Sequence, residues 1–170
     1  MKIITAKELE RPFQVAVVVS RFNKQVTNLL CEGAVQRLKE LEIPNDHVTI
    51  VWVPGAVEIP ITVKHLAKTQ RYSAIITLGA VIRGETGHYD FVCKQVSDGC
   101  LEVALEYCVP VIFGVLTTDN LEQALERAGG NHSHAGRDSV DAAFEMVSVL
   151  AQIGGEKIKA NQFSLDTNLS

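Results

Sequence analysis

Four short runs of apolar, largely β-branched residues constrain the fold of this chain more than any other feature. The runs are VAVVVS at 15–20, HVTIVWV at 47–53, AIITLGAVI at 74–82 and VPVIFGVLT at 109–117. Their apolar residues are continuous instead of alternating with polar ones, which is typical of strands that are covered on both faces. The sequence therefore predicts four strands in the middle of a layered protein.

Helical periodicity fills the segments between and after these runs. From Val26 to Leu41 the apolar residues recur in steps of three and four, as on one face of a helix. The same pattern predicts further helices at about 57–69, 89–106, 119–127 and 138–153. The last helix is expected to end at Gly154-Gly155, since glycine commonly follows a helix. Because strands and helices alternate, the predicted fold class is α/β with a parallel sheet.

The composition is that of a globular protein with a single core. Of 170 residues, 46% are apolar and 21% are charged, and the net charge is -4. Since Lys and Arg do not cluster, the sequence favours small-molecule partners over nucleic acid or a membrane surface. No segment has the length of a membrane span or the pattern of a signal peptide, so we expect a cytoplasmic protein.

One domain accounts for nearly the whole chain. We expect an N-terminal arm at 1–12, a single domain at 13–157 and a disordered polar tail at 158–170. The cysteines form no C-x-x-C pair and lie in apolar segments, so they are predicted to be reduced residues of the core. They are Cys31, Cys93, Cys100 and Cys108.

The loops at the carboxyl ends of the strands are the places to search for a site, because open parallel sheets bind ligands there. These loops are SRFN at 20–23, VPGAVEIP at 53–60, RGETGH at 83–88 and FGVLTTDN at 113–120. Phe22 is an aromatic residue where polar ones are expected. Its ring either serves as a stacking platform or folds back onto the core.

The loop RGETGH leads into a predicted helix that begins near Tyr89. Free backbone N–H groups at a helix start bind anions, and Thr86 adds a hydroxyl donor. A glycine turn in which Thr86 or His88 caps the helix is an equally good interpretation. Glu85 argues against an anion site made of side chains, because a carboxylate repels phosphate. Backbone amides would then have to hold the phosphate.

Two other side chains in these loops can take part in binding or catalysis. His88 is the only imidazole at the end of a predicted strand, and an ordinary histidine pKa of about 6.5 suits proton transfer, although a lone histidine is more often structural. Glu58 falls in the first turn of a predicted helix. It either complements the helix dipole or accepts hydrogen bonds from a polyol.

The segment RAGGNHSHAGRD at 127–138 gathers cations and glycines before the last predicted helix. Arg127 and Arg137 are suited to bidentate contacts with phosphate. His132 and His134 suggest a metal site, but with no Cys and no Glu-x-x-His nearby they fall short of a coordination shell. We therefore predict a solvated loop and no metal.

Four motifs in this order resemble the 6,7-dimethyl-8-ribityllumazine synthase family of riboflavin biosynthesis. They are RFN at 21–23, VPGAVEIP at 53–60, GAVIRGETGHYDFV at 79–92 and ERAGG at 126–130, and the resemblance covers about 13–153. It implies a flavodoxin-like three-layer α/β/α sandwich around a four-stranded parallel sheet. The single domain would then be a lumazine-synthase-like domain.

The resemblance also implies a reaction, the penultimate step of the pathway. A transferase of this family condenses 5-amino-6-(D-ribitylamino)uracil with 3,4-dihydroxy-2-butanone 4-phosphate to 6,7-dimethyl-8-ribityllumazine, releasing phosphate and water. No cofactor and no metal is implied. Subunits would assemble as homopentamers with active sites between neighbours.

The family's residue roles carry over to the matching positions of this chain. His88 would be the general acid and base. The residues that bind the ribitylaminouracil would be Phe22, Asn23, Ala56, Val57, Glu58, Ala80, Val81, Ile82 and Phe113. The residues that bind the phosphate would be Glu85, Thr86 and Arg127, with the first two acting largely through backbone and hydroxyl. Phe113 and Arg127 would come from the adjacent subunit.

One segment departs from the family pattern. After the arginine, family members commonly run through A-G-x-K-A-G-N-K-G, whereas GGNHSHAGRDSVDAA at 129–143 reads as longer and lacks both lysines. Arg137 is a candidate substitute for one lysine. A longer connection resembles that of members that stay as free pentamers instead of icosahedral capsids, so we expect a pentamer.

Two other functions fit parts of the pattern. A non-catalytic flavodoxin-like protein could hold a flavin or a ribityl compound through Phe22 and the glycine loops. A phosphate-dependent enzyme of another class, such as a sugar-phosphate isomerase, could also use the loop RGETGH. The synthase accounts for all four motifs, and it is the function that we expect.

Overall fold

The computed structural model describes residues 1–7, 13–130 and 133–155. Its strands are β1 (Val15–Ser20), β2 (Val48–Val53), β3 (Ala74–Ile82) and β4 (Val111–Thr118). Its helices are α1 (Lys24–Glu40), α2 (Ile59–Lys68), α3 (His88–Tyr107), α4 (Leu121–Arg127) and α5 (Ala135–Gly154), with short 3-10 turns η1 (Asn45–His47) and η2 (Ala56–Glu58). The strands form one parallel sheet in the order β2-β1-β3-β4.

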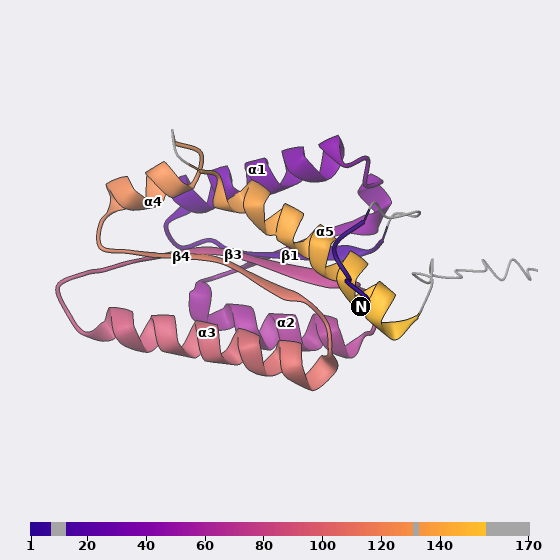
Figure 1. Cartoon of the computed structure of the whole chain (residues 1–170). Coiled ribbons are helices and arrows are strands. Elements are labelled where there is room, and N and C mark those ends of the chain that lie inside the picture. The colour runs from indigo at the N-terminus through magenta and orange to yellow at the C-terminus, as the bar shows by residue number, and fades with distance from the viewer. Residues whose placement is uncertain (8–12, 131–132, 156–170) are drawn as a thin grey trace, which may run out of the picture.

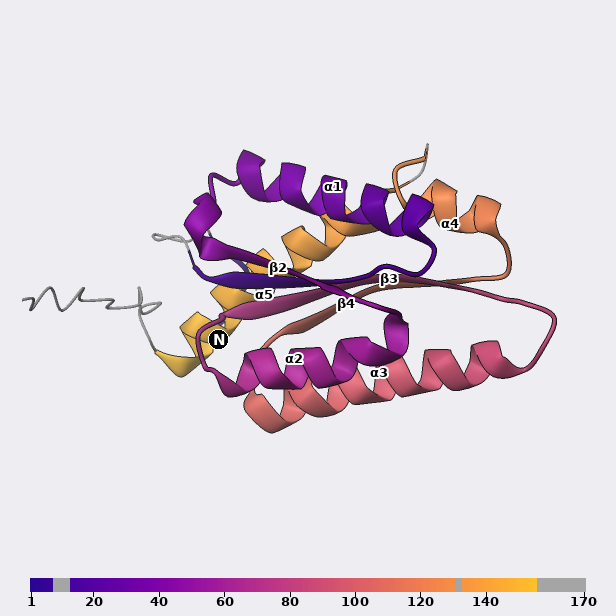
Figure 2. The ribbon, with the colours of Figure 1, turned by 180° about the vertical axis from the view of Figure 1, so that it is seen from behind.

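The sheet is the middle layer of three. Helices α1, α4 and α5 cover one face, and α2 and α3 cover the other (Figures 1 and 2). Successive side chains of β1 serve the two cores in turn, since Val17 packs under α1 and α5 while Ala16 and Val18 pack under α2 and α3. The predicted α/β/α sandwich with a four-stranded parallel sheet is confirmed.

The prediction that all four strands are covered on both faces holds only for the inner two. The side chains of β1 are all buried, and those of β3 are buried up to its last residue. In the edge strands, Ile50 and Trp52 of β2 are 39% and 42% exposed, and Phe113 of β4 is 43% exposed. These apolar side chains are only partly covered by the helices of their own chain.

The last helix begins at Ala135, three residues before the predicted start at 138. The reason is Gly136, where a Cβ would lie 2.1 Å from the carbonyl oxygen of Leu30, so the absence of a side chain lets α5 cross directly over α1. The helix ends as predicted, with Gly155 in the left-handed conformation at φ 64. The connection after Arg127 is therefore short, 128–134.

The N-terminal residues 1–7 run beside α5, where Lys7 N–H donates to Ser148 Oγ at 2.8 Å. The rest of the predicted arm, 8–12, and the predicted tail at 158–170 lie outside the described residues. No helix in the described part of the chain is both long and apolar enough to cross a membrane.

The cysteines are all free, but they are not all in the core. Cys31 and Cys100 are buried as predicted, and Cys93 is half-buried. The prediction is wrong for Cys108, which is exposed and ends α3 in a left-handed conformation at φ 51.

A pair of charged side chains joins the end of α1 to the start of α5. Arg137 donates to both carboxylate oxygens of Glu40, at 2.9 and 2.6 Å, and Arg37 adds a contact at 3.2 Å. The hydrogen bonds from Arg137, followed by those from Arg37, lower the pKa of Glu40 to about 2. The carboxylate is thus favoured in the folded state.

We expect the replacement Glu40→Gln to lower stability at neutral pH. Because the folded-state pKa of Glu40 is depressed, its contribution is present above the ordinary pKa of about 4.5 and is lost as the pH falls towards about 2. The urea concentrations at the unfolding midpoints of the unchanged protein and of Glu40→Gln should differ at pH 7 and converge near pH 2. Glu42→Gln is the control, since Glu42 is exposed and makes no ion pair among the described residues. A difference that is independent of pH would contradict the prediction.

Candidate active site

A cavity of about 310 Å³ lies where β1, β2 and β3 end. This is the crevice in which an open parallel sheet is expected to bind a ligand. Its walls come from the loop after β1, the turn η2, the end of β3 and the first turns of α3. The lining residues are Phe22, Gly55, Ala56, Val57, Ala80, Val81, Ile82, Gly84, Thr86, His88, Tyr89 and Val92. The structure thus brings eight of the predicted site residues together.

The turn after β1 presents Phe22 to the cavity. Asn23 takes a left-handed conformation at φ 57, and its side-chain Nδ2 donates to the carbonyl oxygen of Ala80 at 2.8 Å. The backbone N–H of Phe22 donates to the carbonyl of Pro54 at 3.1 Å. With its backbone held in this way, the Phe22 ring is 70% exposed, so it does not fold back onto the core.

Glu58 lies beside the cavity, half-buried, and does not line it. Its Oε2 accepts from the backbone N–H of Gly55 at 2.8 Å, so the carboxylate caps the start of η2. Glu58 therefore stabilises the start of this turn, in line with the structural one of its two predicted roles. The same hydrogen bond fixes its position next to Ala56 and Val57, two of the lining residues.

Arg83 holds the loop between β3 and α3. Its guanidinium contacts Asp90 of α3 at 3.3 Å and Asp119, just after β4, at 3.2 Å. It also stacks on Tyr89, with Cζ 4.0 Å from the ring centroid. The sequence analysis did not predict this role of Arg83. The signal that could have indicated it was the presence of an acidic residue shortly after each of the strands β3 and β4, namely Asp90 and Asp119. The ends of the loop are tied together while 84–87 stay exposed.

The start of α3 carries no side-chain cap. Gly87 is the N-cap residue, and the contact between the backbone N–H of His88 and Thr86 Oγ is long, at 3.4 Å. The long Thr86 contact agrees with the cap interpretation, and the absence of a side-chain cap at Gly87 agrees with the anion interpretation, so the structure is compatible with both. Glu85 is exposed and does not line the cavity.

Phe113 and Arg127 lie apart from this cavity. Together with Asp138 and Ser139 they line a second cavity of about 390 Å³ between β4 and the start of α5. The two cavities have no lining residue in common. Ten of the predicted site residues thus form two groups on one chain, eight, including His88, around the first cavity and two at the β4 edge. The remaining three, Asn23, Glu58 and Glu85, line neither cavity.

Arg137 is not a phosphate-binding residue in this arrangement. Its guanidinium is engaged by Glu40 in two hydrogen bonds, which argues against the hypothesis that it substitutes for a missing lysine. His132 lies outside the described residues. His134, from the same predicted loop, packs its ring against Gly33 of α1.

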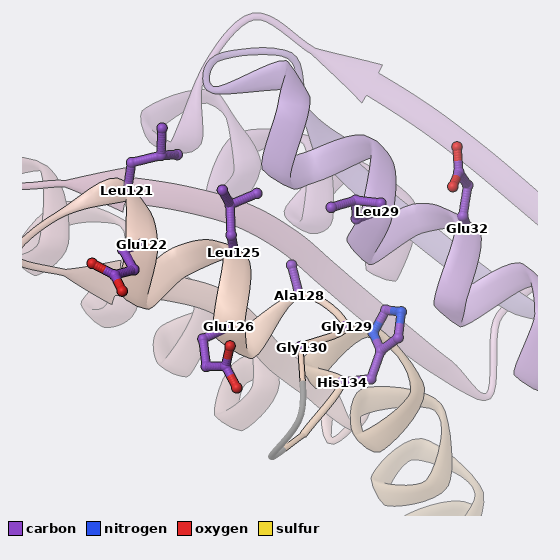
Figure 3. A pocket seen from close by; sticks show the side chains of 10 residues that line it. All are labelled: Leu29, Glu32, Leu121, Glu122, Leu125, Glu126, Ala128, Gly129, Gly130 and His134. Atoms are coloured by element: carbon purple, nitrogen blue, oxygen red, sulfur yellow. The ribbon is translucent and has the colours of Figure 1, made fainter.

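A third cavity, of about 690 Å³, lies between α1, α4 and the connection to α5 (Figure 3). Leu29 and Leu125 contribute apolar side chains, Glu32 and Glu122 contribute carboxylates, and His134 closes one end. It lies on the face of the sheet that α1 covers, opposite to α2 and α3.

Comparison with known proteins points to the same family as the four sequence motifs. The family model for 6,7-dimethyl-8-ribityllumazine synthase matches residues 12–151. The 6,7-dimethyl-8-ribityllumazine synthase of Coxiella burnetii strain Dugway 5J108-111 is 56% identical over 144 residues, which cover 85% of this chain and 95% of the relative. The protein of the same name from strain CbuG_Q212 is 55% identical over the same shares. The chain belongs to the 6,7-dimethyl-8-ribityllumazine synthase family.

Proposed function

We propose that this protein forms 6,7-dimethyl-8-ribityllumazine in riboflavin biosynthesis, at sites that two neighbouring subunits build together. As a lumazine synthase it is a transferase that condenses 5-amino-6-(D-ribitylamino)uracil with 3,4-dihydroxy-2-butanone 4-phosphate, releasing phosphate and water. One observation carries the assignment of the site. In a single cavity an exposed aromatic ring, the backbone of a strand end and the histidine of a helix start meet.

The apolar half of this cavity fits the pyrimidine. Phe22 offers an exposed ring for stacking, an interaction that contributes about 1 kcal/mol beyond the burial of apolar surface. The backbone of Ala80, Val81 and Ile82 supplies N–H and C=O groups for the edge of the heterocycle. Asn23 acts through its hydrogen bond to Ala80, which joins the two walls of the subsite.

The ribityl chain extends towards η2. Ala56 and Val57 line this side of the cavity, and Glu58 accepts hydrogen bonds from the ribityl hydroxyls. Because Gly55 N–H already holds one carboxylate oxygen, the carboxylate is oriented before the substrate arrives. Orientation in advance lowers the entropy cost of binding a flexible polyol.

The phosphate binds at the start of α3. Thr86 offers its hydroxyl, and the amides from Glu85 onward point to the anion with the positive end of the helix dipole. None of the described residues that line this cavity is Lys or Arg, and Arg83 is engaged by two aspartates. A neighbouring subunit's exposed Arg127, together with its Phe113, supplies the cation and completes the site.

The chemistry requires proton transfer but no nucleophile from the protein. The amine of the ribitylaminouracil attacks the ketone and forms an imine with loss of water, phosphate then leaves, and ring closure releases further water. His88, at the meeting point of the two subsites, accepts and returns the protons of these steps. Arg127 and the helix start stabilise the charge of the departing phosphate.

We expect sustained turnover when the purified protein receives both substrates. Formation of the fluorescent lumazine, followed over many equivalents per subunit, distinguishes an enzyme from a non-catalytic protein that binds a flavin or ribityl compound. Omission of the butanone phosphate is the control. Product that stops at one equivalent, or none at all, would contradict the function.

The replacement His88→Ala should lower kcat by about 100-fold without abolishing it. General acid–base catalysis by one side chain contributes on this order, and the gain from holding two reactants together remains. Steady-state rates give kcat, and circular dichroism with a substrate-binding assay checks that the variant is folded and binds. Complete loss of activity in such a variant would contradict the claim that holding the two reactants together supplies much of the rate enhancement.

We also propose that the protein is a free homopentamer in the cytoplasm. The separation of Phe113 and Arg127 from His88 supports sites between subunits, and exposed apolar side chains on α3, such as Phe91 and Leu105, each 71% exposed, suit a subunit contact. The choice of a free pentamer over a capsid rests on the departure of 129–143 from the family's sequence pattern, and the start of α5 at Ala135 adds no support for it.

Light scattering should give the mass of five chains of 18.6 kDa, about 93 kDa. The measurement should be repeated across a range of protein concentrations, so that a slow further assembly would be detected. A mass near that of an icosahedral capsid would overturn the free pentamer, and a monomer mass under assay conditions would overturn the divided site.

A further inference from the structure

The connection between α4 and α5 carries Arg127 at one end and His134 at the other. Ala128, directly after the arginine, is fully buried and forms an isolated antiparallel bridge with His134. The side chain of Arg127 itself is exposed, and α4 is a helix of only 7 residues, too short to be stable by itself. The position of the arginine thus depends on what holds the connection.

The ring of His134 holds it against α1. A Cβ on Gly33 would lie 2.0 Å from Cε1 and 2.2 Å from Nε2 of that ring, so the imidazole occupies the space where other residues have a side chain. The same ring lies 3.3 Å from the Cβ position of Gly129, a residue at φ 131. In Figure 3 the ring points from the connection towards α1.

The ring acts by its shape. Nδ1 of His134 is buried and has no hydrogen-bond partner among the described residues. Burial, followed by the charge of Arg137, lowers the pKa of His134, while Asp138 opposes this. A neutral ring in van der Waals contact with two glycines is the consequence, and an apolar ring of similar shape could take its place.

We propose that His134 is a positioning residue for Arg127: its ring, seated on Gly33, and its backbone bridge to Ala128 fix the end of α4 and thereby the place at which the arginine meets the phosphate in the neighbouring subunit. The inference rests on the proposed role of Arg127. Because only one of the two substrates carries phosphate, the contact should govern the affinity for that substrate alone.

The experiment measures kcat and both KM values in His134 and Gly33 variants. His134→Ala should raise KM for the butanone phosphate about tenfold, the order expected when a charged hydrogen-bonding group is displaced by a fraction of an ångström. KM for the ribitylaminouracil should stay within about twofold, whereas kcat should fall as KM for the butanone phosphate rises, because Arg127 also stabilises the departing phosphate. His134→Phe, which keeps a flat ring, should restore a low KM.

Gly33→Ala tests the same contact from the other side. The added methyl overlaps the ring, so this variant should raise KM for the butanone phosphate although residue 134 is unchanged. In the double variant Gly33→Ala/His134→Ala the overlap is gone and alanine favours the helix, so the melting temperature should recover while the KM stays high. This variant also decides the matter if His134→Ala alone does not fold.

Two controls separate the possible failures. Gly99→Ala creates a similar overlap, 2.6 Å from Pro60 Cβ, on the other face of the sheet, and should lower the melting temperature without a selective effect on one KM. Arg127→Ala should raise KM for the butanone phosphate at least as much as His134→Ala does. If Arg127→Ala has no such effect, the proposed role of the arginine fails.

If Arg127→Ala raises that KM but the His134 and Gly33 variants do not, the positioning role is overturned. The role is also overturned if these variants change both KM values alike, or if His134→Phe behaves as His134→Ala does.

Discussion

The pairing of β1 with β3 is the constraint on which the rest of the structure depends. These parallel strands are in register from Val15 and Ala74 onward, and their side chains are buried on both faces. Since no water reaches their backbone groups, the N–H and C=O of each strand must be paired within the sheet. Parallel pairing also brings the carboxyl ends of the strands to one edge, so Phe22 after β1 and His88 after β3 reach the same cavity although 66 positions separate them in the sequence. The site follows from the topology.

The loop after β3 combines a fixed frame with open amides. Arg83 pairs with two aspartates and stacks on Tyr89, which ties the loop to α3 and to the end of β4. Its charge is thereby used for structure. In the proposed site, the phosphate would meet only uncharged donors of its own subunit, and a cation from elsewhere would tighten its binding. The proposed division between a structural arginine and a binding arginine of a neighbouring subunit would account for a cavity whose lining contains no Lys or Arg.

Much of the fold was predictable, because strand and helix periods and the loops between them follow from local sequence. The strands lie within two residues of their predicted bounds. Two predictions about the fold were wrong, and in both cases the environment of the residues is set by segments that are distant in the sequence. Continuous apolarity in β2 and β4 does not reveal whether a chain's own helices or another surface cover the strand. The sequence predicts a loop at Gly136, whereas this residue lies in α5 and permits close contact with Leu30. For the site, motif spacing grouped the residues around His88, but the pairing of Arg137 with Glu40 spans 97 positions and leaves no local pattern.

The exposure of Phe22 has a further consequence. A large aromatic side chain that is 70% in water favours association with any apolar surface, and this protein carries it at the mouth of its own cavity. The hydrogen bonds of Asn23 and of the Phe22 backbone hold the turn that carries the ring. A single chain therefore leaves an apolar surface open to water at the mouth of the cavity, and under the proposed function a stacked heterocycle would cover it. Because stacking discriminates little between flat heterocycles, selectivity would then come from the polar groups around the cavity.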